Sequence, residues 1–323
     1  MKTGRAVVVP SLISRCHDDG MANPQHVPVI DHELVEALIG EQFPQWADLP
    51  VAQLVPGGWD NRTFRLGDEL SVRLPSSEAY VLQVEKEQRW LPALAPHLPV
   101  AIPEPVGLGK PSERFPSPWS VYRWLPGETP SAELIADDVT LAAHLGDFLA
   151  ALQRVPADGA PPPGAHNFFR GDSPAIYEAE TLRAIKALGG TIDADAVRDV
   201  WRAATSTHWR GGAVWFHGDV SEGNLLVDGT GRLSAVIDFG TSGAGDPACD
   251  LVIGLTTMRD AARDAFREHR GLDADAWARA RGWAIWKALI VAAGFAGSHS
   301  PETETRKARR TIEAVIDDHR RAG

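Results

Sequence analysis

The chain has 323 residues, of which 44% are hydrophobic, and a formal net charge of -11. This length is sufficient for two lobes with their own cores, and the acidic balance argues against a nucleic-acid binder, whose surface is usually basic. No apolar run approaches the roughly 20 residues that span a bilayer. We therefore expect neither nucleic acid nor a membrane as a partner, whereas a cationic or metal-bridged ligand is easier to accommodate.

The N-terminal segment does not resemble a secretory signal peptide. Its short apolar patch is interrupted by Pro10, and no cleavage site of small residues follows. We expect residues 1–24 to be a disordered tail, or in part an over-long start that precedes Met21. Cys16 and Cys249 lie in different contexts and suggest neither a disulfide framework nor a zinc site, so a reducing cytoplasm is favoured.

Residues 25–125 are predicted to form a strand-rich first lobe. Alternation of apolar and polar residues indicates strands, and apolar side chains three or four residues apart indicate helices. In chain order we expect a helix capped by Asp31, then hairpin strands over 49–75 with turns at Gly57-Gly58 and Gly67-Asp68. A helix within 78–100, which Pro92 kinks or ends, is followed by an extended Pro-rich segment over 100–109 and an aromatic-rich strand over 117–125.

Residues 126–323 are predicted to be mostly helical. The first helix of this part has one apolar stripe made of Leu141, Leu145, Phe148, Leu149, Leu152 and Val155. Further helices are expected over 175–188, 195–209, 249–269, 274–295 and 303–321. No exposed heptad pattern or sheet edge indicates a stable assembly, so we expect a monomer or a weak dimer.

The stretch "FHGDVSEGNLLVDGTGRLSAVIDFG", which begins at Phe216, contains the strongest functional signal. Two short apolar runs flank the turn-forming sequence DGTGR, which predicts a hairpin. Asn224 precedes the first strand and Asp238 follows the second, so the hairpin should bring their side-chain oxygens together. Such oxygens suit Mg²⁺. Asp219, on the preceding loop, can then accept a proton from a substrate hydroxyl or orient that hydroxyl.

These motifs carry a family resemblance. The pattern of His217-Gly218-Asp219, Asn224 and Asp238-Phe239-Gly240 resembles protein-kinase-like enzymes, and the HGD form, with "GDPACDL" downstream, is similar to the aminoglycoside phosphotransferase family. The resemblance implies an α+β, bilobal fold with a small β-rich N-terminal lobe, residues 25–125, and a larger α-helical C-terminal lobe, residues 126–323. It also implies that Asp219 is the catalytic base and that Asn224 and Asp238 are Mg²⁺ ligands.

Two further residues of these motifs are interpreted as structural. His217 is expected to position the backbone of the loop rather than to carry a proton. In related folds, an acid at the place of Asp250 anchors the catalytic loop from the start of a helix. Asp246 is expected to be a solvated or capping residue.

The first lobe is expected to bind the nucleotide phosphates. Gly57 and Gly58 could form a turn over the phosphates, because only small residues let backbone amides approach so closely. Arg73 occupies the strand position where kinases carry a phosphate-binding lysine. Arginine keeps the charge and can bind two phosphate oxygens, although the two residues are not interchangeable.

The resemblance also suggests a partner for Arg73 and a site for the purine. Glu85 and Glu87 point to different faces of their helix, and the resemblance favours Glu87 as the ion-pair partner. Backbone groups of Arg123, Trp124 and Leu125, which connect the lobes, would meet the purine edge. Aromatic residues in this segment could equally be core.

The function that these features imply is transfer of the γ-phosphate of ATP or GTP, with Mg²⁺, to a hydroxyl group of a small molecule. The family resemblance implies an aminoglycoside-like or other antibiotic acceptor. The acidic residues of the C-terminal lobe could attract such a cation or simply form a solvated helical face. A macrolide, an amino alcohol or a sugar stays open, and Trp277, Trp283 and Trp286 could line a pocket for a bulkier acceptor or simply pack in the core. A catalytically silent nucleotide-binding module is the rival from another class.

Overall fold

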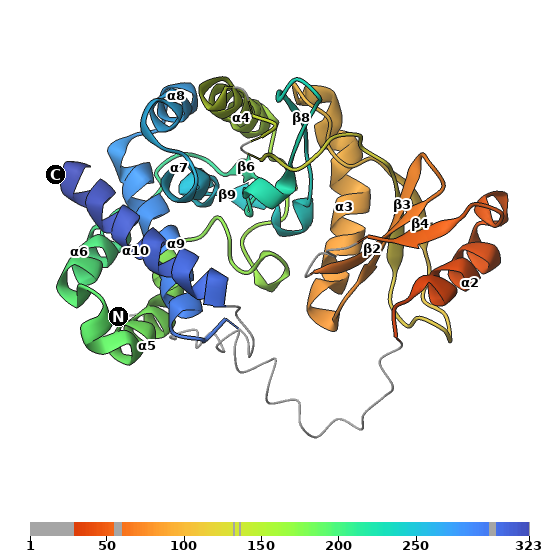
Figure 1. The fold of residues 1–323 in the computed structure, drawn as a ribbon, viewed down its shortest axis with the longest axis horizontal. Coiled ribbons are helices and arrows are strands. Elements are labelled where there is room, and N and C mark those ends of the chain that lie inside the picture. Colours follow the sequence, from red (N-terminus) through yellow and green to blue (C-terminus); the bar gives the residue numbers. More distant parts are fainter. Residues whose placement is uncertain (1–28, 55–59, 132, 136, 297–301, 323) are drawn as a thin grey trace. The chain divides into compact units, whose positions relative to one another are not determined.

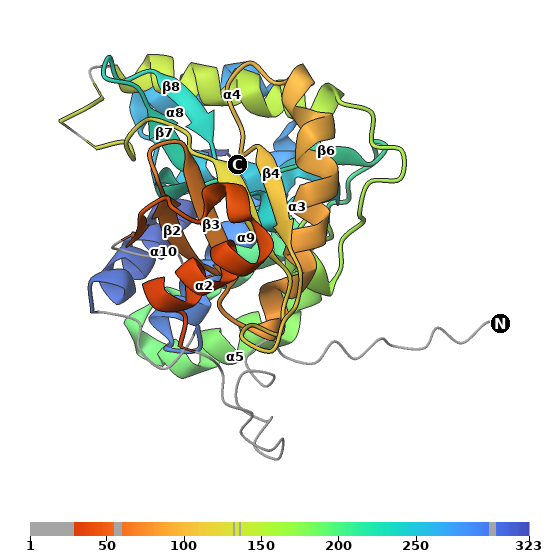
Figure 2. The same cartoon turned by 90° about the vertical axis from the view of Figure 1, so that its right-hand side faces the viewer.

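The structure is a computed structural model, and Figures 1 and 2 show its ribbon from two directions. The residues that it describes are 29–54, 60–131, 133–135, 137–296 and 302–322. The chain forms two compact units. The larger unit comprises Val27–Gly171 and Gly211–Leu272, and the smaller one includes Asp172–Arg210 and Asp273–Gly323. The division into lobes after residue 125 stays a prediction.

The larger unit contains a five-stranded antiparallel sheet with the strand order β1-β2-β3-β5-β4. Its strands are β1 (Val51–Gln53), β2 (Asn61–Leu66), β3 (Leu70–Pro75), β4 (Pro105–Gly109) and β5 (Trp119–Arg123). In the register of the sheet, Arg73 in β3 lies opposite Thr63 in β2 and Ser120 in β5. The predicted turn at Gly67-Asp68 is confirmed.

Helices α2 (His32–Gln42) and α3 (Val81–Leu94) lie on opposite faces of this sheet (Figure 1). Asp31 caps α2, as predicted, by accepting a hydrogen bond from the Leu34 amide at 3.0 Å. In Figure 2 α2 lies in front of β2 and β3, where its buried side chains pack against those of the sheet. Because side chains alternate along a strand, Arg73 faces away from this core. Helix α3 continues past Pro92 for two residues.

The rest of the larger unit carries the sequence with the kinase-like motifs. Its elements are α4 (Asp138–Arg154), β6 (Val214–Phe216), β7 (Leu225–Val227), β8 (Leu233–Val236), β9 (Gly243–Gly245), α7 (Val252–Thr256) and α8 (Asp260–Arg270). The predicted apolar stripe of α4 is confirmed, since its members are buried or nearly so. Strands β7 and β8 form the predicted hairpin.

The prediction of one helix over 249–269 is wrong. A 3-10 helix, Pro247–Leu251, leads into α7, and α8 begins only at Asp260. The amides of Thr257 and Met258 both bond the Ile253 carbonyl, at 3.0 and 3.2 Å, and this closes α7. Arg259 is then extended, so a helical sequence pattern is divided by a local change of backbone direction.

The smaller unit is helical. Its helices are α5 (Glu178–Leu188), α6 (Ala194–Thr205), α9 (Ala274–Ala292) and α10 (Glu302–Ala322). The helix expected over 195–209 ends at Thr205, because the hydroxyls of Thr205, Ser206 and Thr207 bond back to carbonyls of α6 and compete with its continuation. Within the described residues, every helix is too short or too polar to cross a membrane.

Candidate functional site

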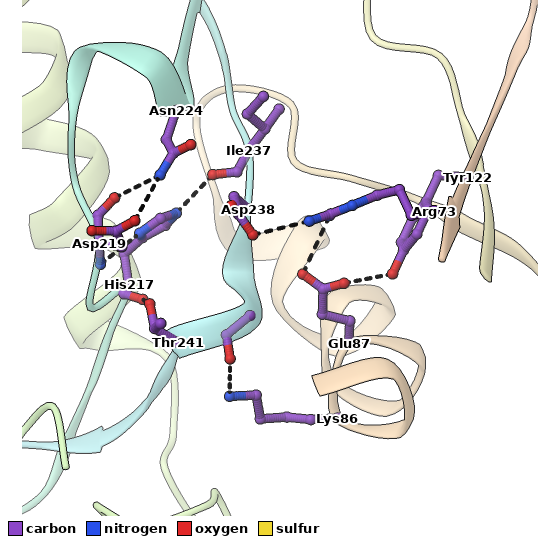
Figure 3. Close-up of polar contacts among 11 residues, drawn as sticks. Arg73, Lys86, Glu87, Tyr122, His217, Asp219, Asn224, Ile237, Asp238 and Thr241 are labelled. Carbon is purple, nitrogen blue, oxygen red and sulfur yellow. Dashed lines mark hydrogen bonds and ion pairs between the residues drawn. The ribbon is translucent and has the colours of Figure 1, made fainter. Parts of the chain in front are cut away.

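The β7–β8 hairpin brings Asn224 and Asp238 together. Asn224 ends a short 3-10 turn before β7, and its carbonyl accepts a hydrogen bond of 2.9 Å from the amide of Ile237, the residue that follows β8. The Asn224 side-chain amide donates to the Asp219 carbonyl at 2.8 Å and to Asp219 Oδ2 at 3.3 Å (Figure 3). These bonds orient the amide so that its oxygen points away from Asp219, and they leave the exposed Asp219 carboxylate beside it.

Asp238 has an unusual backbone conformation, with φ 67° and ψ 68° in the left-handed region. A non-glycine residue in this region carries strain, and such strain occurs preferentially at functional sites. The conformation directs the Asp238 side chain toward β3, where its Oδ1 lies 3.0 Å from Nη2 of Arg73. The hairpin and the sheet therefore meet at one carboxylate.

The loop that carries Asp219 is anchored by Asp250. The two carboxylate oxygens of Asp250 accept hydrogen bonds from the His217 and Gly218 amides, at 2.9 and 2.7 Å. Burial raises the pKa of Asp250, although these amides and the nearby His217 and Arg270 lower it. Gly218 has φ +88°, and a Cβ atom there would lie 2.6 Å from the Thr241 carbonyl oxygen. A glycine between the histidine and the aspartate is thus required by the backbone.

His217 is fully buried and its ring is committed to the backbone. Its Nδ1 accepts a hydrogen bond from the Asp219 amide at 3.3 Å, and its Nε2 lies 3.0 Å from the Ile237 carbonyl. This pattern requires the hydrogen on Nε2. The geometry matches a residue that connects the Asp219 loop to the end of β8.

Arg73 links three elements of the larger unit. Its Nη1 lies 3.6 Å from Glu87 Oε1 on α3, and the other oxygen of Glu87 accepts a 2.5 Å hydrogen bond from the Tyr122 hydroxyl on β5 (Figure 3). Burial disfavours the charge of Arg73, but Glu87 and Asp238 outweigh that effect and raise its pKa above the ordinary value. The structure thus brings Arg73, Glu87 and Asp238 together, whereas the Glu85 side chain is exposed.

The segment 123–125 begins at the last residue of β5. The Arg123 amide donates to the Glu104 carbonyl at 2.9 Å, and the Trp124 amide donates to the Glu69 carbonyl at 2.7 Å. The Trp124 ring stacks under the guanidinium of Arg65 at 3.8 Å. A hollow of about 520 Å³ adjoins Arg123 and Trp124.

Some predicted residues are not placed at the site. Gly57 and Gly58 lie outside the described residues. Trp277, Trp283 and Trp286 are 6%, 2% and 4% exposed, so they pack in the interior of the smaller unit. Asp246 is buried and caps a 3-10 helix through the Ala248 amide, at 3.1 Å.

Three side chains near the Glu87 and Asp238 carboxylates were not identified from the sequence: Asp60, Lys86 and Tyr122. Burial raises the pKa of Asp60 to about 6, and the nearby charges of Asp238 and Asp219 act in the same direction. Lys86 precedes Glu87, and its ammonium contacts the backbone after Asp238. In the sequence, each of them is marked only by its place next to a predicted loop, helix or connecting segment. Such a position does not show where the side chain points.

Comparison with known proteins bears on the family and the fold. The profile of a phosphotransferase enzyme family matches residues 51–283. No curated protein matches the chain significantly. Among solved structures, a GDP complex of aminoglycoside 2'-phosphotransferase-IIIa has a TM-score of 0.68 and 20% identity, covering 90% of this chain and 99% of that chain.

Two other solved structures show the same fold. The macrolide 2'-phosphotransferase MphH from Brachybacterium faecium has a TM-score of 0.57 and 24% identity, covering 87% of this chain and 97% of that chain. A streptomycin-ATP-APH(2")-IIa ternary complex has a TM-score of 0.58 and 16% identity, covering 92% and 99%. With its five-stranded antiparallel sheet, mostly helical remainder and kinase-like motifs, the chain belongs to the phosphotransferase enzyme family.

Proposed function

We propose that this protein is a small-molecule kinase that transfers the γ-phosphate of ATP or GTP to a hydroxyl group of an aminoglycoside-like or other antibiotic. The observation that carries the proposal is that Asp219, Asn224 and Asp238 lie at the open end of the β7–β8 hairpin, where Arg73 contacts Asp238. Phosphoryl transfer needs little covalent chemistry from the protein, so positioning and charge are sufficient to explain such a site.

Asp219 is assigned to the acceptor. It is exposed, and its backbone is fixed by Asp250 through the neighbouring amides, so its carboxylate can meet a hydroxyl without rearrangement of the loop. A carboxylate at this place accepts the hydroxyl proton or orients the oxygen for attack.

Asn224 and Asp238 fit a magnesium ion. The Asn224 oxygen is left available by the bonds that its nitrogen makes, and Asp238 adds a carboxylate. Across the described residues, no cluster of three or more His, Cys, Asp or Glu side chains could hold a metal by itself. Phosphate oxygens and water would complete such a shell, as is usual for Mg²⁺, which would neutralise charge on the phosphates.

The nucleotide is assigned to Arg73 and the segment after β5. Arg73 is held by Glu87, which is held by Tyr122, so its guanidinium is oriented before a phosphate arrives. Since the Arg123 and Trp124 amides are already engaged, we assign the Arg123 carbonyl and the Leu125 amide to the purine edge. Gly57 and Gly58 are assigned to the phosphate turn.

The acceptor class rests on two supports. The chain is acidic, which favours a cationic ligand. Solved structures of the same fold are described as aminoglycoside phosphotransferases, and one as a kanamycin complex. Macrolide 2'-phosphotransferases share the fold as well, so macrolides are the second acceptor class to test.

The test is acceptor-dependent nucleotide consumption by the purified protein with Mg²⁺ and either ATP or GTP. Acceptors are offered as separate panels of aminoglycosides, macrolides, amino alcohols and sugars, and Asp219→Asn is the control. We expect turnover with one panel and its loss in the control. Tight nucleotide binding with no turnover on any panel would favour a silent nucleotide-binding module.

A further inference from the structure

Lys86 is a buried cation on α3, one residue before Glu87. Its side chain is only 8% exposed. The Nζ atom donates to the Gly240 carbonyl at 2.5 Å and to the Ser242 carbonyl at 3.0 Å. Figure 3 shows the side chain pointing from α3 toward the segment that carries Thr241. This ammonium is therefore bound to the backbone that directly follows Asp238.

His166 provides the third partner of this ammonium. Its Nδ1 lies 3.2 Å from Lys86 Nζ, and its Nε2 lies 2.9 Å from the Pro162 carbonyl. A carbonyl can only accept, so the hydrogen of the neutral ring sits on Nε2 and Nδ1 is an acceptor. An ammonium has three N–H donors, and here each has an acceptor.

The charges around Lys86 are consistent with this arrangement. Burial lowers the pKa of Lys86 to about 8, against the effects of Glu87 and Asp238, which raise it. Burial, and then the charge of Lys86, lower the pKa of His166. The imidazole is thus kept neutral, which is the state that can accept from Lys86.

The loop Pro161–Gly171, which carries His166, also contacts the motif segments directly. Arg170 Nε donates to the Gly218 carbonyl at 3.0 Å, and the Ala244 amide donates to the Pro161 carbonyl at 2.9 Å. Lys86 lies where α3, this loop and the segment after Asp238 meet.

We propose that Lys86 is a positioning residue, which sets the place of Asp238 by fixing the backbone after it and by joining the loop Pro161–Gly171 to α3. Two successive residues of α3 then position the Asp238 carboxylate. Glu87 acts through Arg73, and Lys86 acts through the Gly240 and Ser242 carbonyls. The effect on catalysis rests on the proposed function, whereas the contact with His166 does not.

The first experiment compares Lys86→Met with Lys110→Met, a matched change at an exposed lysine. Methionine retains the length and apolar stem but leaves the Gly240 and Ser242 carbonyls without this donor, so Lys86→Met should also lose some stability. We expect Lys86→Met to lower kcat about tenfold or more, while Lys110→Met stays within about twofold of the unmodified protein. The midpoint of thermal unfolding shows whether each variant is folded.

A double-mutant cycle separates a local contact from general damage. His166→Phe keeps a ring but removes the acceptor for Lys86. If the residues act together, the double variant loses no more kcat than Lys86→Met alone, because the interaction is already absent. Folded Lys86→Met with kcat within twofold of the unmodified protein, or fully additive losses, would overturn the proposal.

The second experiment needs no turnover. Nitrogen-15 NMR of the imidazole should show His166 as the Nε2–H tautomer, and a pH titration should show its pKa rising in Lys86→Met, but not in Lys110→Met. A mixed tautomer, or an unchanged pKa in Lys86→Met, would overturn the contact. If the unmodified protein lacks turnover, the proposed kinase fails and this experiment still decides the Lys86–His166 contact.

Discussion

Polar groups are buried in two regions of this molecule, with different outcomes. In the smaller unit, Arg281 on α9 pairs with Asp318 on α10 at 3.0 Å, and the two side chains are 7% and 3% exposed. Near the β7–β8 hairpin, by contrast, buried Asp250 holds a loop in which Asp219 is exposed to solvent.

The difference shows which features indicate chemistry. Burial of polar groups is common to both regions. Only the hairpin region combines it with an aspartate in the left-handed conformation and with carboxylate and amide oxygens directed outward. A buried ion pair whose members face each other indicates packing, whereas oriented, exposed acceptors beside strained backbone indicate a site.

The largest effect is expected at Asp219. We expect Asp219→Ala to lower kcat on the order of 10²-fold or more, because the acceptor hydroxyl loses its base or orienting group. The matched control is Asp228→Ala in the turn of the adjacent β7–β8 hairpin, whose carboxylate accepts from the Thr230 and Arg232 amides of that turn. Steady-state kinetics on an accepted substrate checks both. Equal losses would mean that the hairpin is merely destabilised.

The buried pair of the smaller unit should affect stability instead. Asp318→Ala leaves Arg281 buried without this partner, which costs about 3 kcal/mol of unfolding free energy. Urea unfolding measures this loss, and kcat well below the unfolding temperature should be unchanged. Replacing both residues, with Arg281→Met and Asp318→Leu, should restore most of the stability. A large loss of kcat in folded Asp318→Ala would remove the contrast between the regions.

Replacing Arg73 tests whether the site needs its two separate contacts, one with Glu87 and one with Asp238. Its Nη1 faces Glu87 and its Nη2 faces Asp238, and a lysine has a single nitrogen for both. We expect Arg73→Lys to raise KM for the nucleotide about tenfold, with retained folding. Arg114→Lys, at an exposed position paired with Glu41, is the control. An unchanged or lower KM in Arg73→Lys would show that a point charge is sufficient.

Asp60 should give the smallest effect, one on stability against pH. In the absence of metal and nucleotide its pKa is raised from 3.8 to about 6, so between these values the folded state binds more protons than the unfolded state. This residue therefore makes unfolding free energy fall as pH rises from about 4 to 6. Asp60→Asn should remove that part of the dependence, leaving the variant relatively more stable at pH 7. Parallel pH curves for the two proteins would contradict the prediction.

Much of the local structure could be predicted from the sequence. Alternation predicted strands β1, β2 and β3, the turn-forming residues predicted the β7–β8 hairpin, and apolar spacing predicted the stripe of α4. These features depend on neighbours in the chain. The helix over 249–269 was mispredicted because its interruption depends on two amides that share the Ile253 carbonyl, a choice that periodicity does not show.

Sequence alone also determined the candidate Asp219, Asn224 and Asp238 set, since a hairpin necessarily brings its two ends together. Only the tertiary structure decided which acid on α3 faces Arg73, that Tyr122 and Lys86 join the same contacts, and that three tryptophans are core. These contacts join residues that are far apart in the chain, and they depend on how the helices pack on the sheet and on the hairpin. Spacing along a sequence determines which side chains share one face of a helix or strand, whereas packing determines which other residues those side chains contact.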